Sequence, residues 1–376
     1  MKKVKVGVFG VGRGGSMMGY CKRAENAELV AVCDQWEEGL LKKKKDFGDD
    51  AISYYTSFDE FIRHDMDAVV LANYANEHAP FAVKCLQHGK HVMSEVLPVN
   101  SMAEAVALVE AVEGSKAVYA YAENYCFMPA PYRMRELYRQ GVLGEFEYGE
   151  GEYLHNCESI WPSITQNGNP NHWRKTMYAT FYCTHSLGPL IHITGLRPVS
   201  VTGFEMPVNA RMKRMGANFG HTAVEMVTLE NGAVVKSIHG IGCSRNSIWY
   251  LINGSKGSME SARETAGEGV SRIYVMCDKY EGENAWHHET YLPTGPLSEL
   301  AKGYGHGASD FYTMHNFIEK IRGNDTDTID VYEALDMFLP GLFANRSILN
   351  GGVPMAVPDL RKKELRDAWR NDKQPK

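Results

Sequence analysis

The side chains best suited to acid/base chemistry lie in the segment FYCTHSLGPLIHITG, residues 181–195. Tyr182 and His185 are spaced to lie about one turn apart on a helix. Histidine titrates near neutral pH and can take a proton from a substrate hydroxyl, and a helix N-terminus favours its neutral form. We therefore predict that an apolar helix presents both residues, with a break at Gly188-Pro189. A histidine buried for structural reasons is the alternative interpretation.

A glycine-rich loop near the N-terminus predicts where a dinucleotide binds. The strand VKVGVF is followed at once by a GxGxxG pattern and a helical stretch, and a second strand, AELVAVCD, ends in an aspartate. In this fingerprint, glycines let backbone N–H groups approach a pyrophosphate, and the carboxylate binds ribose hydroxyls. Asp34 would repel a 2′-phosphate, so we expect NAD rather than NADP, although Arg13 could allow dual use and a ligand-free turn can give the same pattern. The predicted cofactor residues here are Gly10, Gly12, Arg13, Gly14, Gly15 and Asp34.

Strands and helices alternate through the next hundred residues and must position this loop. DAVVLAN, KHVMSE and AVYAYAEN are typical of buried parallel strands, and one intervening helix begins with a capping box at Ser101 and Glu104. The pattern predicts a doubly wound parallel sheet, in which ligands lie beyond the carboxyl ends of the strands. Polar residues at or just after those ends either extend the cofactor site or simply terminate the strands. They are Asn73, His78, Glu95 and Asn124.

The remainder of the chain is rich in strands. FEYGEGEYLHN, HTAVEMVTL, AVVKSIHG and SIWYLIN follow one another with turn signals such as ENG, which predicts a large, mainly antiparallel sheet. Two helices are expected after it. We therefore place a NAD-binding Rossmann domain at residues 1–123 and a substrate-binding and oligomerisation α/β domain at residues 124–376.

Composition excludes several classes of protein. The chain has 376 residues, enough for two domains, and a formal net charge of −6, which argues against a nucleic-acid or membrane-surface partner. We expect neither a signal peptide nor a membrane span, because no apolar stretch approaches ~18 residues. Eight cysteines without CxxC pairs favour a reducing, cytoplasmic location. No metal is expected, because the histidines lack carboxylate or cysteine partners at ligand spacing.

These features together resemble the Gfo/Idh/MocA oxidoreductases, the family of glucose–fructose oxidoreductase and inositol dehydrogenase. The likeness rests on the fingerprint, the HGKHVMSE strand, the AEN strand end and the GHGASDF helix start. It implies a Rossmann domain, an α/β domain with an open antiparallel sheet, a small sugar or cyclitol substrate, and a homo-oligomer, either dimer or tetramer. The family's Glu-Lys-Pro motif is replaced by Glu95-Val96-Leu97-Pro98, and Val96 cannot move a proton.

The second half also resembles a narrower family on this fold, the NAD-dependent α-N-acetylgalactosaminidases. That resemblance implies catalytic roles for Glu123, Tyr153, Tyr182 and His185, with Trp173 and Arg174 near a sugar or nicotinamide ring. Two departures are Ser186, where the family has glycine, and Leu97 before the proline. The matching segments are Glu95-Val96, Glu123-Asn124, Tyr153-Leu154-His155-Asn156, Trp173-Arg174 and Tyr182-Cys183-Thr184-His185-Ser186-Leu187-Gly188-Pro189.

We expect from this an NAD-dependent oxidoreductase that removes a hydride from a ring hydroxyl carbon, the third, of a sugar or glycoside. His185 and Tyr182 would act as the acid/base pair. One alternative is a glycosidase that recycles tightly bound NAD through oxidation, elimination, water addition and reduction, with Tyr153 and Glu123 supplying the additional acid/base groups. A second alternative is a non-catalytic NAD-binding sensor.

Overall fold

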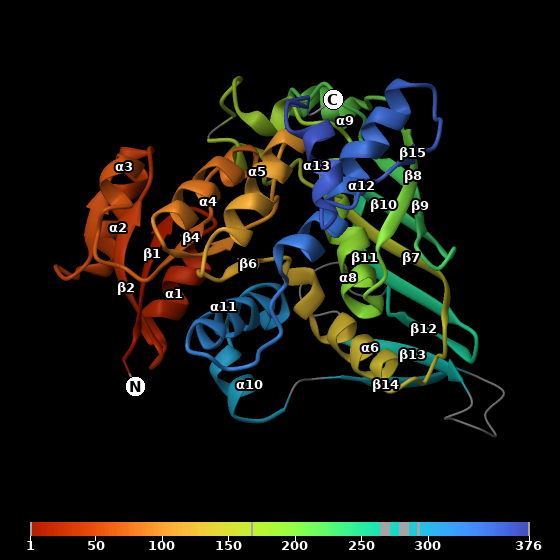
Figure 1. Cartoon of the computed structure of the whole chain (residues 1–376), viewed down its shortest axis with the longest axis horizontal. Coiled ribbons are helices and arrows are strands. Elements are labelled where there is room, and N and C mark those ends of the chain that lie inside the picture. The colour runs from red at the N-terminus through yellow and green to blue at the C-terminus, as the bar shows by residue number, and fades with distance from the viewer. Residues whose placement is uncertain (1, 167, 264–270, 278–285, 292–293, 375–376) are drawn as a thin grey trace. The chain divides into compact units, whose positions relative to one another are not determined.

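The computed structural model describes residues 2–166, 168–263, 271–277, 286–291 and 294–374, which form two compact units. The first unit contains the described residues up to Glu123, Gly303–Ala334 and residues 360–374. Helix α11 (Ser309–Ile321) accounts for part of this return, because it packs beside α1 (Gly15–Arg23) (Figure 1). The second unit comprises Asn124–Lys302 and Leu335–Asp359.

The first unit is built on a parallel sheet with the strand order β3-β2-β1-β4-β5-β6. This order confirms the predicted doubly wound fold, and the near-continuous apolar sequence of β1 fits a strand buried on both faces. The pairing is in register across the centre, where Val8 of β1 lies beside Val32 of β2 and Val70 of β4. The strands are β1 (Val4–Phe9), β2 (Ala27–Cys33), β3 (Ser53–Tyr55), β4 (Ala68–Leu71), β5 (His91–Ser94) and β6 (Tyr119–Tyr121).

Helices connect these strands, as the alternating pattern predicted. The capping box is present at the start of α5, where Ser101 Oγ accepts a hydrogen bond from the Glu104 N–H at 3.3 Å and Glu104 accepts one from the Asn100 N–H at 2.6 Å. The other helical elements of this unit are α2 (Glu37–Phe47), α3 (Phe58–Phe61), η1 (Ala75–Glu77), α4 (His78–Gln87), α5 (Met102–Glu113), η5 (His306–Ala308) and α13 (Lys363–Trp369).

The second unit contains a sheet with the order β14-β13-β12-β11-β7-β10-β9-β8-β15, antiparallel except where β10 pairs with β7. Helix α8 (Cys183–Thr194) lies against β7, β10 and β11. It approaches so closely that a Cβ on Gly151 of β7 would overlap the Ser186 carbonyl oxygen. The strands are β7 (Phe146–Asn156), β8 (Pro198–Glu205), β9 (Ala223–Leu229), β10 (Val234–Gly240), β11 (Gly242–Gly254), β12 (Gly257–Ser261), β13 (Arg272–Cys277), β14 (His287–Thr290) and β15 (Met355–Ala356).

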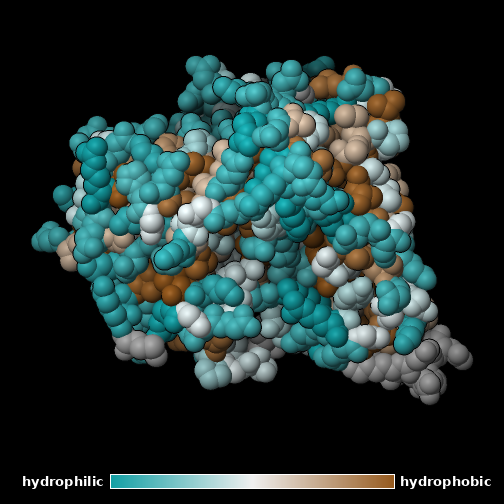
Figure 2. Space-filling model, viewed as in Figure 1, coloured by the Kyte–Doolittle hydropathy of each residue, from teal (hydrophilic) through white to brown (hydrophobic). Residues whose placement is uncertain are grey.

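The remaining helical elements include α12, which begins in the first unit and lies mostly in the second. Among the described residues, none of the helices is long and apolar enough to span a membrane. The face drawn in Figure 2 is mostly hydrophilic, with hydrophobic residues in scattered patches. The elements are η2 (Asn124–Phe127), α6 (Pro129–Arg139), α7 (Trp161–Ile164), η3 (Trp173–Lys175), α9 (Ala210–Met215), α10 (Pro296–Ala301) and α12 (Val331–Leu349).

Candidate functional site

The glycine-rich loop turns sharply from β1 into α1, and two of its glycines are required by close backbone packing. Gly10 has φ +112°, and a Cβ there would overlap the carbonyl oxygen of Ala72. A Cβ on Gly14 would overlap the carbonyl oxygen of Gly10. These contacts hold the loop against the carboxyl end of β4, where a doubly wound sheet binds its ligand.

The same loop leaves room for a pyrophosphate. A Cβ on Gly12 or Gly15 would meet nothing within 4 Å, so that side of the loop is open. Helix α1 begins there without a side-chain hydrogen bond to its first N–H groups, which suits an anion. At the end of β2, Asp34 accepts hydrogen bonds from the N–H groups of Val11 at 2.7 Å and Trp36 at 2.8 Å. Its remaining lone pairs can accept from ribose hydroxyls, so the residues present fit NAD.

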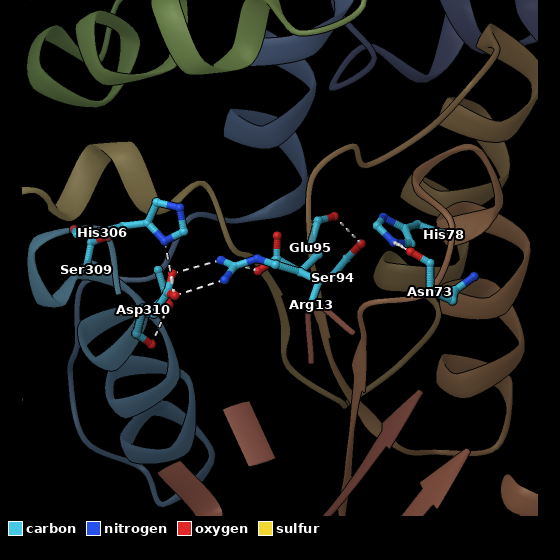
Figure 3. A network of polar contacts seen from close by, with 9 residues as sticks. Arg13, Asn73, His78, Ser94, Glu95, His306, Ser309 and Asp310 are labelled. Atoms are coloured by element: carbon cyan, nitrogen blue, oxygen red, sulfur yellow. Dashed lines mark hydrogen bonds and ion pairs between the residues drawn. The ribbon is translucent and has the colours of Figure 1, made fainter. Parts of the chain in front are cut away.

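Asn73 and His78 follow β4 but differ in their bonding (Figure 3). The Asn73 amide is buried, and its Nδ2 and Oδ1 lack a hydrogen-bond partner of ordinary geometry among the described residues, while its side chain acts to lower the pKa of Glu77. The His78 ring is buried and lies 2.9 Å from the Leu97 carbonyl oxygen through Nδ1. The structure therefore gives His78 a role in holding the Val96-Leu97 segment, and its contact with cofactor stays a prediction.

Arg13 is tied to two carboxylates of its own unit (Figure 3). Its Nη1 and Nη2 donate to Asp310 Oδ2 and Oδ1 at 2.9 and 2.8 Å, and Nη2 lies 2.8 Å from Glu95 Oε1. Burial raises the pKa of Glu95, and Arg13 opposes that shift. Burial also acts against ionisation of Asp310, but hydrogen bonds from Arg13 and His306 lower the pKa of Asp310. These carboxylates compete with any 2′-phosphate for Arg13.

Four aromatic side chains lie close together in the second unit, and their polar atoms could exchange a proton with a substrate hydroxyl. The His185 and Tyr182 rings are stacked, with centroids 5.7 Å apart and planes 10° apart. His185 also lies 4.7 Å from the Tyr153 ring and 4.4 Å from that of Tyr125, a residue in η2. His185 is buried at 7% exposure, and its ring is surrounded by phenols rather than by aliphatic side chains alone. We call Tyr125, Tyr153, Tyr182 and His185 the tyrosine–histidine cluster.

The predicted break at Gly188-Pro189 is wrong, because α8 continues through both residues to Thr194. Proline has no N–H, so Pro189 cannot donate to the carbonyl of His185, its partner four residues earlier. The Tyr250 hydroxyl of β11 donates to that carbonyl oxygen instead, at 2.6 Å. The backbone of His185 is therefore held by the sheet as well as by its own helix.

The acid/base properties of the cluster follow from its burial. Burial, together with neighbouring Tyr125, raises the pKa of Tyr153 well above its usual value. The Tyr153 hydroxyl therefore keeps its proton at neutral pH and can donate a hydrogen bond. Glu123, the last residue of the first unit, is fully buried, and Asn124 begins η2 with 4% exposure.

Trp173 and Arg174 lie in η3, in the same unit as the cluster. The Arg174 guanidinium carbon is 4.4 Å from the centroid of the Trp173 ring, a cation–π contact. Trp173 also packs 5.5 Å from Phe181, the residue before Tyr182, and its buried Nε1 makes no hydrogen bond within the described residues. The structure thus connects η3 to the segment that carries Tyr182, while a contact with cofactor or sugar stays a prediction.

A buried polar network lies beneath the first turn of α8. Ser186 Oγ is 2.8 Å from Ser237 Oγ and 3.3 Å from His239 Nδ1, and His239 Nε2 is 3.6 Å from Glu225 Oε1, too far for a hydrogen bond. Ser186, Ser237, His239 and Glu225 have no exposed surface, so a substrate cannot reach this Ser-His-Glu arrangement. Burial lowers the pKa of His239 to about 3 and raises that of Glu225 well above its ordinary value.

Sequence reasoning missed several of these residues. Tyr125 directly follows the Glu123-Asn124 strand end, and that adjacency was a usable signal. Asp310 and His306 lie in the GHGASDF segment at the start of a helix, but nothing in the sequence connected them to the glycine-rich loop. Asp310 is 297 residues from its partner Arg13 in that loop. Tyr250 and Glu225 occur in ordinary strand patterns that gave no indication of their contacts.

Both halves of the chain resemble known proteins. Residues 4–123 match the GFO_IDH_MocA domain, described as an oxidoreductase family with an NAD-binding Rossmann fold, and residues 201–367 match the glycosyl hydrolase 109 C-terminal domain. A glycosyl hydrolase family 109 protein of Solibacter usitatus is 26% identical, covering 95% of this chain and 88% of that protein. An α-N-acetylgalactosaminidase of Bacteroides fragilis is 24% identical over 98% of this chain and 93% of its own length.

Solved structures share the fold over nearly the whole chain. Levoglucosan dehydrogenase in complex with NADH and L-sorbose has a TM-score of 0.78 at 18% identity, covering 96% of this chain and all of that one. The myo-inositol 2-dehydrogenase of Lactobacillus plantarum has a TM-score of 0.73 at 15% identity, with 95% of this chain and all of that chain covered. At these identities the likeness establishes the fold alone.

Proposed function

We propose that this protein cleaves glycosides with NAD as a recycled cofactor, because residues 4–123 match the NAD-binding domain of Gfo/Idh/MocA oxidoreductases and residues 201–367 match a glycosyl hydrolase 109 C-terminal domain. The substrate would be a small glycoside, of the class named for the α-N-acetylgalactosaminidase relatives. The first step is the one expected from the sequence, removal of a hydride from a ring hydroxyl carbon.

The cofactor and the protein divide this chemistry. Bound NAD supplies a hydride acceptor that can also return the hydride. Gly12, Gly15, Asp34 and Asn73 would hold it, because the two glycines leave open space at a helix N-terminus without a side-chain cap, Asp34 has lone pairs beyond those its two N–H partners use, and Asn73 has a buried amide. The remaining chemistry is proton transfer, and it falls to the tyrosine–histidine cluster.

Each proton transfer has a candidate group. His185 would take the proton of the oxidised hydroxyl at an imidazole nitrogen, with the stacked Tyr182 orienting the ring. The resulting carbonyl makes the neighbouring C–H acidic, so that a base can remove its proton and the aglycone can leave. Water then adds at the carbon that the aglycone left, and return of the hydride to the carbonyl restores the hydroxyl. Tyr153, which burial keeps protonated, would donate to the leaving oxygen. Glu123 is the candidate for the base.

The observation that carries this proposal is the tyrosine–histidine cluster itself. A hydride transfer alone needs one acid/base group, whereas oxidation followed by elimination needs several. Tyr153, Tyr182 and His185 lie within 6.5 Å of one another by ring centroid and present two phenols and an imidazole. Tyr125 adds a third phenol at 4.4 Å from the imidazole.

A sugar or glycoside dehydrogenase is the second candidate, and one observation favours it. Ser186 occupies the position where the glycosidase pattern has glycine, and the buried network around it is formed by Ser237 and His239. The first turn of α8, which carries His185, therefore differs from the glycosidase pattern, whereas a dehydrogenase needs only the hydride transfer and one acid/base group.

One experiment separates the candidates. The protein is mixed with NAD and a panel of nitrophenyl glycosides, and absorbance is followed for nitrophenol and NADH. Nitrophenol without net NADH supports the glycosidase, and NADH without nitrophenol supports the dehydrogenase. A thermal shift with NAD but neither product would indicate a non-catalytic sensor and would refute both enzymatic candidates.

We further propose a homo-oligomer, dimer or tetramer, in the cytoplasm. The sheet of the second unit offers exposed apolar side chains for association, such as Phe204 on β8 at 51% and Met276 on β13 at 44% exposure. All eight cysteines are free, and seven of them are buried, which fits a reducing compartment. Size-exclusion chromatography with light scattering would test the assembly.

A further inference from the structure

We propose that Arg13, Glu95 and Asp310 form a latch that controls how fast NAD leaves its site. The proposal rests on the NAD-binding function and adds a role for α11, which joins the first unit from late in the chain. The latch is not a catalytic group. It is a set of positioning residues that keep the glycine-rich loop in the conformation that binds pyrophosphate.

The loop is held from two sides through one side chain. Arg13 lies between Gly12 and Gly14, and its guanidinium makes a two-pronged ion pair with Asp310 on α11 and a third contact with Glu95 at the end of β5 (Figure 3). The side chains of Asp310 and Glu95 are 1% and 5% exposed. Opening the loop would leave these carboxylates buried without their cation, which is far costlier than losing a surface pair.

The turn before α11 has a strained backbone that side-chain contacts hold in place. His306, Gly307 and Ala308 all have left-handed backbone conformations, with φ of 55°, 64° and 73°. Such conformations are unfavourable for residues other than glycine and persist only where surrounding contacts hold them. Ser309 Oγ donates to the His306 carbonyl oxygen at 2.8 Å, and His306 Nδ1 lies 3.2 Å from Asp310 Oδ2. The strained turn thus aims Asp310 at Arg13.

A latch of this kind affects the rate of NAD release more than the stability of the rest of the first unit. The loop is already pinned at Gly10 and Gly14 by backbone packing, so loss of the ion pair frees the Arg13 segment without dismantling the sheet. The open side at Gly12 and Gly15 is where a pyrophosphate fits. Dissociation of NAD should therefore speed up when the latch is cut, because the N–H groups that bind the phosphates are no longer held in place.

The test measures cofactor release rather than turnover. The full-length protein is loaded with NADH and mixed with a large excess of NAD, and the loss of bound-NADH fluorescence gives the dissociation rate. We expect Asp310→Asn, which removes the carboxylate charge and keeps the shape, to accelerate release about tenfold or more. Asp49→Asn is the matched control, since it removes one charge from the exposed Lys22–Asp49 pair of the same unit and should leave the rate unchanged.

Two further variants keep the test decisive. Ala308→Gly relieves strain in the turn without touching the ion pair, so it should leave release unchanged or slow it. If Asp310→Asn does not fold, Arg13→Lys keeps one charge, loses the two-pronged geometry and should still accelerate release. A release rate for the folded latch variant that equals the wild-type rate would overturn the proposal, whatever the glycoside assay shows. A failed glycoside assay with accelerated release would instead refute only the proposed reaction.

Discussion

Replacing Glu225 with glutamine should stabilise the protein at neutral pH, although the replacement removes a buried acid next to a histidine. Glu225 lies on β9 without exposed surface, and its Oε1 is 3.6 Å from His239 Nε2. Burial raises the pKa of Glu225 well above 4.5. The folded state therefore keeps a proton that the unfolded chain releases once the pH exceeds 4.5.

The sign and size of the effect follow from that proton. The stability that Glu225 contributes is fully present below pH 4.5 and falls as pH rises towards the folded pKa, by ~1.4 kcal/mol per pH unit. Above pH 4.5 the wild-type protein loses unfolding free energy at that rate until the pH reaches the folded pKa. Glutamine carries no ionisable proton, so Glu225→Gln avoids this loss. The stability difference between the two proteins should grow from near zero at pH 4.5 by up to ~1.4 kcal/mol per pH unit.

His239 determines how the stability of the wild-type protein changes at low pH. Burial lowers the pKa of His239 to about 3, so its contribution is present above pH 6.5 and is lost as pH falls towards 3. Above pH 4.5, as long as Glu225 keeps its proton in the folded state and His239 is still charged in the unfolded chain, the two groups cancel, because the folded and unfolded pair then hold one proton each. The pair alone therefore predicts a plateau in this range and a decline on both sides.

Urea unfolding from pH 4 to 8 measures these profiles, with the m-value checked for constancy. Glu260→Gln on β12 of the same sheet is the control, because Glu260 is only half-buried and its replacement should change stability by less than ~1 kcal/mol at any pH. Parallel profiles for wild type and Glu225→Gln would show that Glu225 ionises in the folded state as readily as in the unfolded chain. That result would refute the reasoning.

Three further predictions concern the tyrosine–histidine cluster and its supports. His185→Ala should lower turnover by ~10²- to 10⁴-fold with NAD affinity kept, as steady-state kinetics and a binding titration can measure; near-normal turnover would remove His185 from catalysis. Tyr250→Phe should cost ~1–3 kcal/mol in urea unfolding and lower kcat, because the His185 carbonyl loses its donor; unchanged values of both would show that the helix alone positions it. Gly151→Ala should destabilise by several kcal/mol, since the new Cβ overlaps the Ser186 carbonyl; a wild-type denaturation midpoint would contradict that packing.

Much of the first unit could be predicted because its signals are local. The GxGxxG loop, Asp34 and the capping box at Ser101 are set by residues near one another in the chain. The break predicted at Gly188-Pro189 failed because a tertiary contact intervenes. Proline usually weakens a helix by freeing a carbonyl, and here the Tyr250 hydroxyl, from a distant strand, satisfies that carbonyl.

The candidate site was predicted only in part for the same reason. Tyr153, Tyr182 and His185 were found through their motif, and the structure shows that they are neighbours. The partners of Arg13 could not be found, since Asp310 lies 297 residues away and no periodicity reports such a contact. The return of residues 303–334 to the first unit was missed because helical periodicity shows which face of α11 is apolar but not which unit it covers.

The late arrival of α11 also affects how this protein is made. Arg13 precedes Asp310 by 297 residues, so at ~5–20 residues per second the ribosome produces the glycine-rich loop about 15–60 s before its carboxylate partner. Once residue 121 has been translated, the nascent N-terminal segment has all the strands of its sheet but still lacks the helix that completes the unit. A polypeptide that stops before α11 would present a dinucleotide site without its latch, so chains translated nearly to their end should hold the cofactor longer than truncated ones.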